Sequence, residues 1–351
     1  SSETDSGLRR FISAKRNPSA GVSLPNVTLA ISAADSWDDG VSTDHDHLHP
    51  TWIEAERSGT TKLSFNAEAT DHITLFASLN GTGDTTLGLQ QMLADRRLDV
   101  FHAGPALSPF ERFSGDLSGG GLALAPSEDV EIAISAYTNA GDGQVTEAAM
   151  QKVEITKDLI SHVKLRLGLG LIQEEDGFLG ANATGVFGED LESRSRFADL
   201  SIMAAISERI DWFASYSRGK ASIAGDSRGF LGEWSSAHAD AFATGVSIRD
   251  LSTKGDGLSF IVGQPFRGDR AKATLTVPVG RTTDGTVVTE QQRIDLEPSS
   301  REFISEANYH WSFGQNGTQE ISTGGFIRIN PNHNAEEAPV VGLGLRYRWQ
   351  F

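Results

Sequence analysis

The sequence predicts an all-β protein: a transmembrane, antiparallel, up-and-down β-barrel of about 12 strands, with a short α-helix in its lumen. Segments of nearly equal length alternate apolar and polar residues. No run of about 20 apolar residues exists that could form a membrane-spanning helix. Long polar connections at 173–197 and 219–239 contrast with short turns at 255–256 and 297–300, an asymmetry typical of outer-membrane barrels.

The C-terminal strand, 341–351, shows the alternation most clearly. Leu343, Leu345, Tyr347 and Trp349 share one face, because side chains of a strand point to opposite faces in turn. Arg346 and Arg348 lie on the other face with glycines between them. One face therefore suits hydrocarbon and the other suits water.

Eleven further segments repeat this pattern, which gives twelve strands in all. They are 121–126, 130–138, 163–171, 198–206, 209–218, 240–251, 258–263, 272–279, 287–296, 303–313 and 320–330. An even count fits a bacterial barrel.

The alternation assigns side chains to the two faces of the wall. Those expected to face the lumen are Lys164, Arg166, Lys272, Glu306, Glu320, Arg328, Arg346 and Arg348. Those expected to face lipid are Leu165, Leu167, Tyr309, Trp311, Leu343, Leu345, Tyr347 and Trp349.

The chain divides into three predicted parts. Residues 120–351 form the barrel, and residues 84–119 hold a linker and a pore helix at 85–97, where Leu89, Met92 and Leu93 recur at helical spacing. Residues 1–83 are β-rich. They form either an accessory segment or extra strands, which would raise the count to about 14–16.

Composition excludes several classes of function. The net charge of -17 argues against a nucleic-acid partner, and the absence of Cys excludes thiol chemistry and disulfides. No catalytic constellation is present, so no enzyme activity and no cofactor are expected. His45, His47 and His49 are the densest group of metal-ligand type, but a solvated polar loop is the better explanation for them, so no metal is predicted. The acidic start of the chain is no secretory signal, which implies that an export signal was removed or lies upstream.

Three segments, taken in their order along the chain, carry a resemblance to a known family. Residues 257–267 (GLSFIVGQPFR), 273–279 (ATLTVPV) and 293–302 (RIDLEPSSRE) look like the C-terminal translocator barrel of subtilisin-like, S8-type autotransporters of Gram-negative bacteria. The loop at 176–180 is also similar. Ser300 stands where that family usually has Gly, and no subtilisin-like peptidase motif is present.

The resemblance implies a translocator in the bacterial outer membrane that provides the pore for protein secretion. Its partners would be outer-membrane lipid and lipopolysaccharide, the outer-membrane assembly machinery, and its own or an upstream passenger domain. The aromatic end formed by Tyr347, Trp349 and Phe351 is similar to the signal that this machinery reads.

Three alternatives stay open at this stage. A diffusion porin or ligand-specific channel would share the barrel. A structural or adhesive surface barrel would bind partners through long loops that carry Phe230 and Trp234. A soluble β-sandwich shows the same strand period, but not twelve repeats of membrane length.

Overall fold

The structure is a computed structural model that describes most of the chain. The described residues are 22–24, 27–33, 36–37, 57–58, 61–70, 72–81, 104–107, 117–139, 147–175, 177–179, 181–182, 191–225, 230–313 and 319–349.

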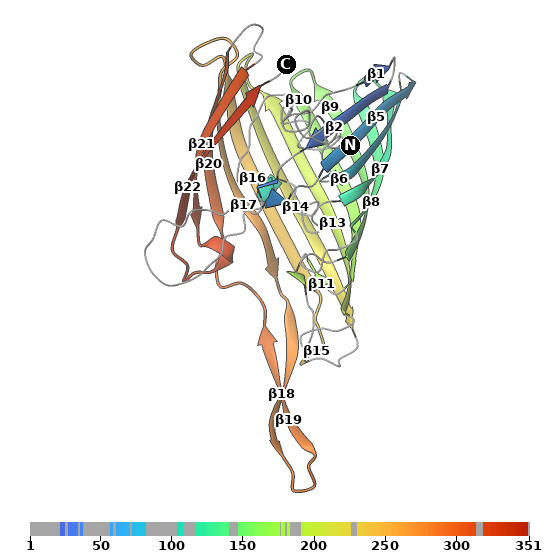
Figure 1. Cartoon of the computed structure of the whole chain (residues 1–351), viewed down its shortest axis with the longest axis vertical. Helices are drawn as coiled ribbons and strands as arrows, with labels where there is room; N and C mark the ends of the chain where they lie inside the picture. The colour runs from blue at the N-terminus through green and yellow to red at the C-terminus, as the bar shows by residue number, and fades with distance from the viewer. Residues whose placement is uncertain are drawn as a thin grey trace, which may run out of the picture.

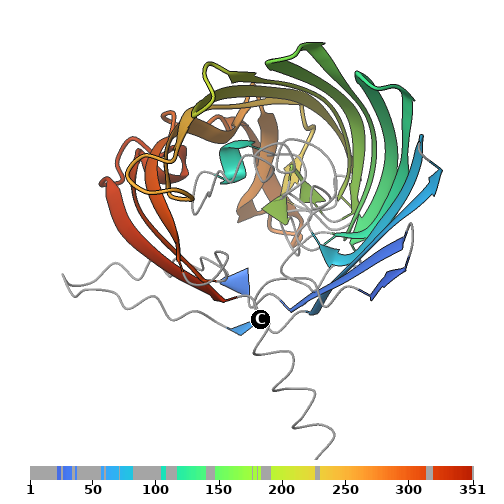
Figure 2. The ribbon, with the colours of Figure 1, turned by 90° about the horizontal axis from the view of Figure 1, so that it is seen from above.

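One large antiparallel sheet dominates, and its strands follow one another in chain order (Figure 1). Within the described residues it has 15 strands. They are β1 (Val22–Leu24), β2 (Val27–Ala33), β5 (Thr61–Thr70), β6 (Ile73–Gly81), β7 (Leu117–Ser127), β8 (Val130–Asn139), β9 (Glu147–Ile160), β10 (Val163–Glu175), β13 (Leu191–Ala205), β14 (Ile210–Gly225), β16 (Ala237–Arg249), β17 (Gly257–Asp269), β20 (Phe303–Phe313), β21 (Gln319–Ile329) and β22 (Val340–Trp349). The sheet curls into a ring (Figure 2), which confirms the up-and-down barrel. No pairing joins β1 to β22 among these residues.

Smaller elements accompany the wall. They are β3 (Ser36–Trp37), β4 (Arg57–Ser58), β11 (Gly177–Phe178), β12 (Ala181–Asn182), β15 (Leu231–Gly232), β18 (Lys272–Arg281), β19 (Val287–Asp295), the helix α3 (Gly104–Leu107) and the 3-10 turn η3 (Pro331–His333). In the described part of the chain, no helix is long and apolar enough to cross a bilayer.

The strand count needs two corrections. Segments 272–279 and 287–296 form β18 and β19, which pair with each other and with β15 instead of joining the wall. Their hairpin extends beyond the wall (Figure 1). Conversely, β9 is a wall strand that the sequence pattern missed, because its outer row mixes Val153 and Ile155 with Gln151 and Lys157.

Strands from the first 83 residues belong to the same sheet, since β5 pairs with β6 and β6 pairs with β7. The total lies within the upper predicted range of about 14–16. The part that the sequence assigned to the barrel supplies eleven of these strands, from β7 to β22.

The two ends of the barrel differ. At the short-turn end, only Ser161 and His162 separate β9 from β10, and 206–209 separate β13 from β14. At the long-connection end, 176–190 lie between β10 and β13, and 270–302 lie between β17 and β20. The segment 297–300 lies at this long-connection end, although the sequence suggested an ordinary short turn. Strand β22 finishes at the short-turn end.

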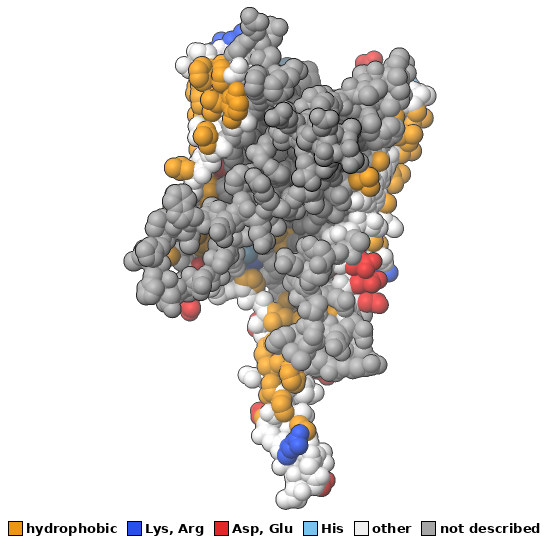
Figure 3. Space-filling view, in the orientation of Figure 1, with side chains coloured by type: hydrophobic (Ala, Val, Ile, Leu, Met, Phe, Trp, Pro, Cys, Tyr) orange, Lys and Arg blue, Asp and Glu red, His pale blue; other side chains and the backbone are white. Residues whose placement is uncertain are grey.

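The wall is apolar outside and polar inside. Outward side chains such as Leu169 (55% exposed) and Leu343 (89% exposed) alternate with buried inward groups along the strands. Hydrophobic side chains spread over the visible outer wall in Figure 3. This arrangement inverts that of a soluble protein, in which large apolar side chains are buried.

Candidate functional site

A buried ion network lies on the inner face of β9, β10 and β13. The Lys152 Nζ is 3.2 Å from Glu154 Oε1 and 3.7 Å from Asp199 Oδ2. Arg166 donates to the same Glu154 carboxylate. Both cationic side chains are only 2% exposed. Two cations and two carboxylates balance, so this patch of the lining is neutral in a chain of net charge -17.

Gly168 makes this network geometrically feasible. It faces Glu154 on β9 and Asp199 on β13 across the ladders. A Cβ at this position would lie 3.2 Å from Lys152 Cε and 3.3 Å from Asp199 Oδ2. The missing side chain therefore lets Lys152 reach over β10 to its second carboxylate.

The helix α3 packs on an apolar part of the inner lining. Its Ala106 and Leu107 are buried against Phe213, Ile261 and Ile304. A Cβ on Gly263 would lie 2.7 Å from the Ala106 Cβ, so this glycine admits the helix. Figure 2 shows α3 inside the ring of strands. In the sequence, α3 lies between β6 and β7, whereas the predicted helix at 85–97 lies outside the described residues.

Most residues expected in the lumen occupy inward positions. Arg166 and Glu306 are 2% and 1% exposed, and the Asn308 amide donates to Glu306 at 2.5 Å. Lys164 is closer to water at the short-turn end, with its Nζ 3.7 Å from Asp158 Oδ1. Glu320 and Arg348 are register partners, as are Ser322 and Arg346.

Lys272 was wrongly expected in the lumen. It lies on β18, outside the wall, where its side chain is 48% exposed and its Nζ is 4.0 Å from Asp295 Oδ2. A hairpin in solvent shows the same period of two as a wall strand, so alternation alone cannot distinguish them.

Those residues expected to face lipid whose side chains the structure describes lie on the outer face. Leu167, Trp311, Leu345 and Tyr347 are exposed by 42%, 45%, 76% and 52%, respectively. Leu165 and Tyr309 are half-buried in the same outer rows, and Trp349 belongs to the same alternation on β22.

Aromatic side chains flank this outer surface. The Trp311 and Phe313 rings are 5.0 Å apart at the short-turn end, and Phe242 and Phe303 are 6.3 Å apart toward the other end. Phe303 and Trp311 are eight residues apart on β20, about 27 Å along the strand. Aromatic residues at both edges of an apolar band are characteristic of membrane barrels.

A polar cluster closes the long-connection end of the wall, and we call it the rim cluster. It comprises Gln264, Arg267, Arg301, Glu302, Arg328 and His333. Arg267 donates to the carbonyl oxygens of Ser300 and Pro298, each at 3.1 Å, and Arg301 donates to Gln264 Oε1 at 2.6 Å. Arg328 binds Glu302 through two hydrogen bonds of 2.6 and 3.2 Å.

The segments 257–267 and 293–302, far apart in the sequence, thus meet in the rim cluster. His333 joins them, because its Nδ1 accepts from the Glu302 backbone N–H at 2.9 Å and its Nε2 donates to the Phe266 carbonyl at 2.7 Å. Burial lowers the pKa of this imidazole below its ordinary value. The neutral imidazole has one N–H donor and one acceptor nitrogen, so it satisfies both of these hydrogen bonds.

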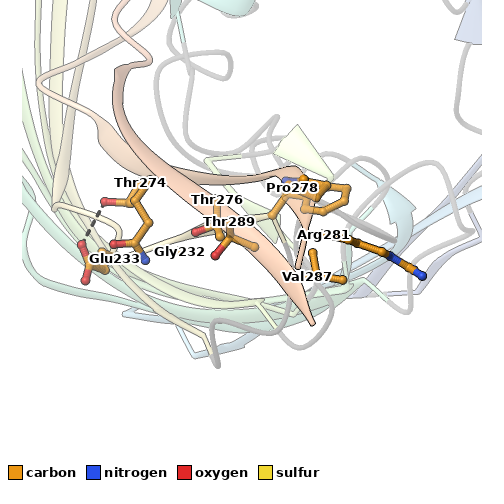
Figure 4. A pocket seen from close by; sticks show the side chains of 11 residues that line it. Gly232, Glu233, Thr274, Thr276, Pro278, Arg281, Val287 and Thr289 are labelled. Atoms are coloured by element: carbon orange, nitrogen blue, oxygen red, sulfur yellow. Dashed lines mark hydrogen bonds between the residues drawn. The ribbon is translucent and has the colours of Figure 1, made fainter. Parts of the chain in front are cut away.

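A shallow concavity of about 800 Å³ lies on the sheet of β15, β18 and β19 (Figure 4). Thr274, Thr276 and Thr289 line it, and the Thr274 hydroxyl donates to Glu233 Oε2 at 2.9 Å. Phe230 is exposed at its edge, whereas Trp234 packs on Phe178 with ring centroids 5.3 Å apart.

Sequence reasoning missed Lys152, Glu154, Asp199 and His333. The first two lie on β9, and only the alternation of Val153 and Ile155 with charged residues could have located that strand. Asp199 and His333 gain their roles through strand pairing, which the sequence does not display. His45, His47 and His49 lie outside the described residues, and no metal-type cluster occurs within those residues.

Comparisons with known proteins find matches among solved structures. No family model matches the chain, and no curated protein does. A solved structure, the CymD monoaromatic hydrocarbon channel, matches with a TM-score of 0.41 and 10% identity, over 67% of this chain and 74% of that one.

Proposed function

We propose that this protein is an outer-membrane barrel of the autotransporter type, which anchors a passenger and provides the pore for its export. The observation that carries membrane insertion is the outward apolar surface. Largely exposed leucines such as Leu343 and Leu345 would be unfavourable in water and favourable in acyl chains. Insertion would depend on the outer-membrane assembly machinery, and we assign the protein no catalytic activity.

The rim cluster supports the finer assignment to autotransporters. Two of the three segments that resemble this family meet there: Arg267 of 257–267 donates to the Ser300 carbonyl, and Arg301 of 293–302 donates to Gln264. A shared set of motifs that converges on one tertiary contact is expected when the fold is shared.

Surface display tests this proposal. An export signal and a protease-sensitive reporter are fused upstream of residue 1 and expressed in a Gram-negative host. We expect added protease to cleave the reporter on intact cells. A reporter that stays in the periplasm while the barrel is inserted would overturn the translocator assignment but not the barrel.

A second candidate function is a diffusion channel, and one observation favours it. The helix α3 lies in the sequence between β6 and β7, which are hydrogen-bonded neighbours, and its packing on the inner wall narrows the lumen. Conductance of the purified protein in planar bilayers distinguishes the candidates. A steady open conductance without surface display would favour the channel.

A further inference from the structure

Three cations stand side by side on the outside of the wall, near the long-connection end. Arg196 on β13 is the register partner of Lys220 on β14, and Arg218 lies two residues before Lys220. All three side chains are exposed. Strand geometry places their Cα atoms about 5–7 Å apart. We call this group the outer basic patch.

The outer basic patch lacks compensating charge. Among the described residues, no carboxylate lies within ion-pair distance of these three cations, and like charges on paired strands repel. Asp240, the register partner of Arg218, is engaged elsewhere: its Oδ2 accepts from Arg301 at 3.4 Å and from Gln264 at 3.2 Å. The patch is thus suited to an external anion.

The height of the outer basic patch relative to the apolar surface indicates which kind of anion it would bind. The next outward row toward the short-turn end contains Leu200 and Tyr216, which are 47% and 42% exposed. The cations therefore begin where the apolar surface stops, with a tyrosine at the boundary. Strand β14, 16 residues long, continues past the length needed to span hydrocarbon. In a bilayer, the three cations would therefore lie at the level of the phosphate groups of lipid headgroups.

An apolar depression adjoins the patch. It measures about 840 Å³, and the side chains that line it include the outward Leu122, Ile134, Val153 and Leu169, with Arg196 at its edge. The row that continues from Arg196 across the ladders consists of Leu171, Gln151, Ala136 and Gly120, and its far part is shallow because Ala136 and Gly120 are small. A hydrocarbon chain can lie in this depression while its headgroup reaches Arg196.

We propose that the outer basic patch and the adjoining depression bind one phosphorylated glycolipid of the outer leaflet, the lipid A part of lipopolysaccharide. The cations hold its phosphates and the depression holds an acyl chain. This inference rests on the proposed outer-membrane location, in which the long-connection end faces outward.

Binding of lipid A to the full chain, folded in detergent micelles, tests the inference by native mass spectrometry and titration. The triple variant Arg196→Gln, Arg218→Gln, Lys220→Gln should bind about a hundredfold more weakly, since each cation near an anionic headgroup contributes roughly a factor of five. Dephosphorylated lipid A should bind the unaltered protein as weakly as intact lipid A binds the triple variant. Millimolar inorganic phosphate should not displace lipid A, because it lacks the chain.

A matched triple variant at the short-turn end, Lys157→Gln, Arg209→Gln, Lys254→Gln, removes the same charge and should bind like the unaltered protein. Ala136→Trp should weaken binding by filling the depression, whereas Ala307→Trp, on the outer face of β20, should not. Equal binding by both triple variants, or displacement by phosphate alone, would overturn the proposal. Heat-modifiable migration first verifies that each variant is a folded barrel, so failed insertion is distinguished from failed lipid binding.

Discussion

At the residue scale, alternation decided which way a side chain points, and pairing decided what it meets. Arg166 and Glu306 are inward on their strands, as their positions predict. The carboxylate that holds Arg166 lies on β9, and Lys152 reaches a second carboxylate on β13 in addition to Glu154 on its own strand. These partners depend on the register of three adjacent strands.

Glu154→Gln should destabilise the barrel strongly. The substitution leaves Lys152 and Arg166 buried with one carboxylate between them, and breaking a buried pair costs about 3–5 kcal/mol. The exposed pair of Lys157 and Asp129 provides the control, because Lys157→Gln should cost less than about 1 kcal/mol. Urea titration of folded barrels in vesicles measures both. Equal losses would show that the network is open to water.

Acidification should loosen the rim cluster through His333. Its pKa in the folded protein is lowered by burial, so the unfolded chain binds a proton first as the pH falls below about 6.5. The stability contribution is complete above that pH and is lost progressively below it. His333→Gln should flatten this dependence, and the exposed His162→Gln should not. Thermal unfolding between pH 5 and pH 8, about the range where histidine titrates, gives the readout.

At the element scale, strands with the same alternating pattern occupy different places in the fold. Strands β17 and β18 both alternate, yet only β17 has wall neighbours on both sides. The turn between β18 and β19 is locally stabilised by Asp284, whose pKa is lowered by the Thr282 hydroxyl and by the Thr286 backbone and hydroxyl.

The hairpin of β18 and β19 should be dispensable for folding. Replacing 276–291 with a short glycine linker removes no wall pairing and keeps Arg267 and Glu297 in the rim cluster. We expect unchanged heat-modifiable migration on gels. Loss of the folded form would mean that the hairpin helps the wall to assemble.

Displacing α3 should widen the lumen. Leu107→Asp puts a charge into the cluster formed with Phe213 and Ile261, at a cost of several kcal/mol for an unpaired buried carboxylate. Bilayer conductance should therefore rise relative to Leu107→Met, which keeps the volume. Identical conductance in the two variants would show that α3 does not limit the pore.

At the scale of the whole molecule, the decisive question is whether lipid or water surrounds the outside of the wall. Leu345 is 76% exposed, so in water its replacement by arginine would change stability little. In a bilayer, Leu345→Arg should cost about 2–4 kcal/mol near the midplane. Folding titrations in vesicles measure this difference, with Leu345→Ile as the control. A cost near zero would contradict membrane insertion.

The sequence by itself determined the class of the fold, the inward and outward rows, and the absence of apolar helices, because a period of two and the length of an apolar stripe are local properties. Local patterns also located segments 257–267 and 293–302, but not their meeting at Arg267 and Ser300.

Only the tertiary structure decided which alternating strands form the wall, where α3 packs, and which charges meet. Strand β9 joined the wall and β18 left it, since membership depends on hydrogen bonds to neighbours and not on the strand's own pattern. The outer basic patch has the same origin: Arg196 and Lys220 are 24 residues apart in the chain, and their shared location follows from the register between β13 and β14.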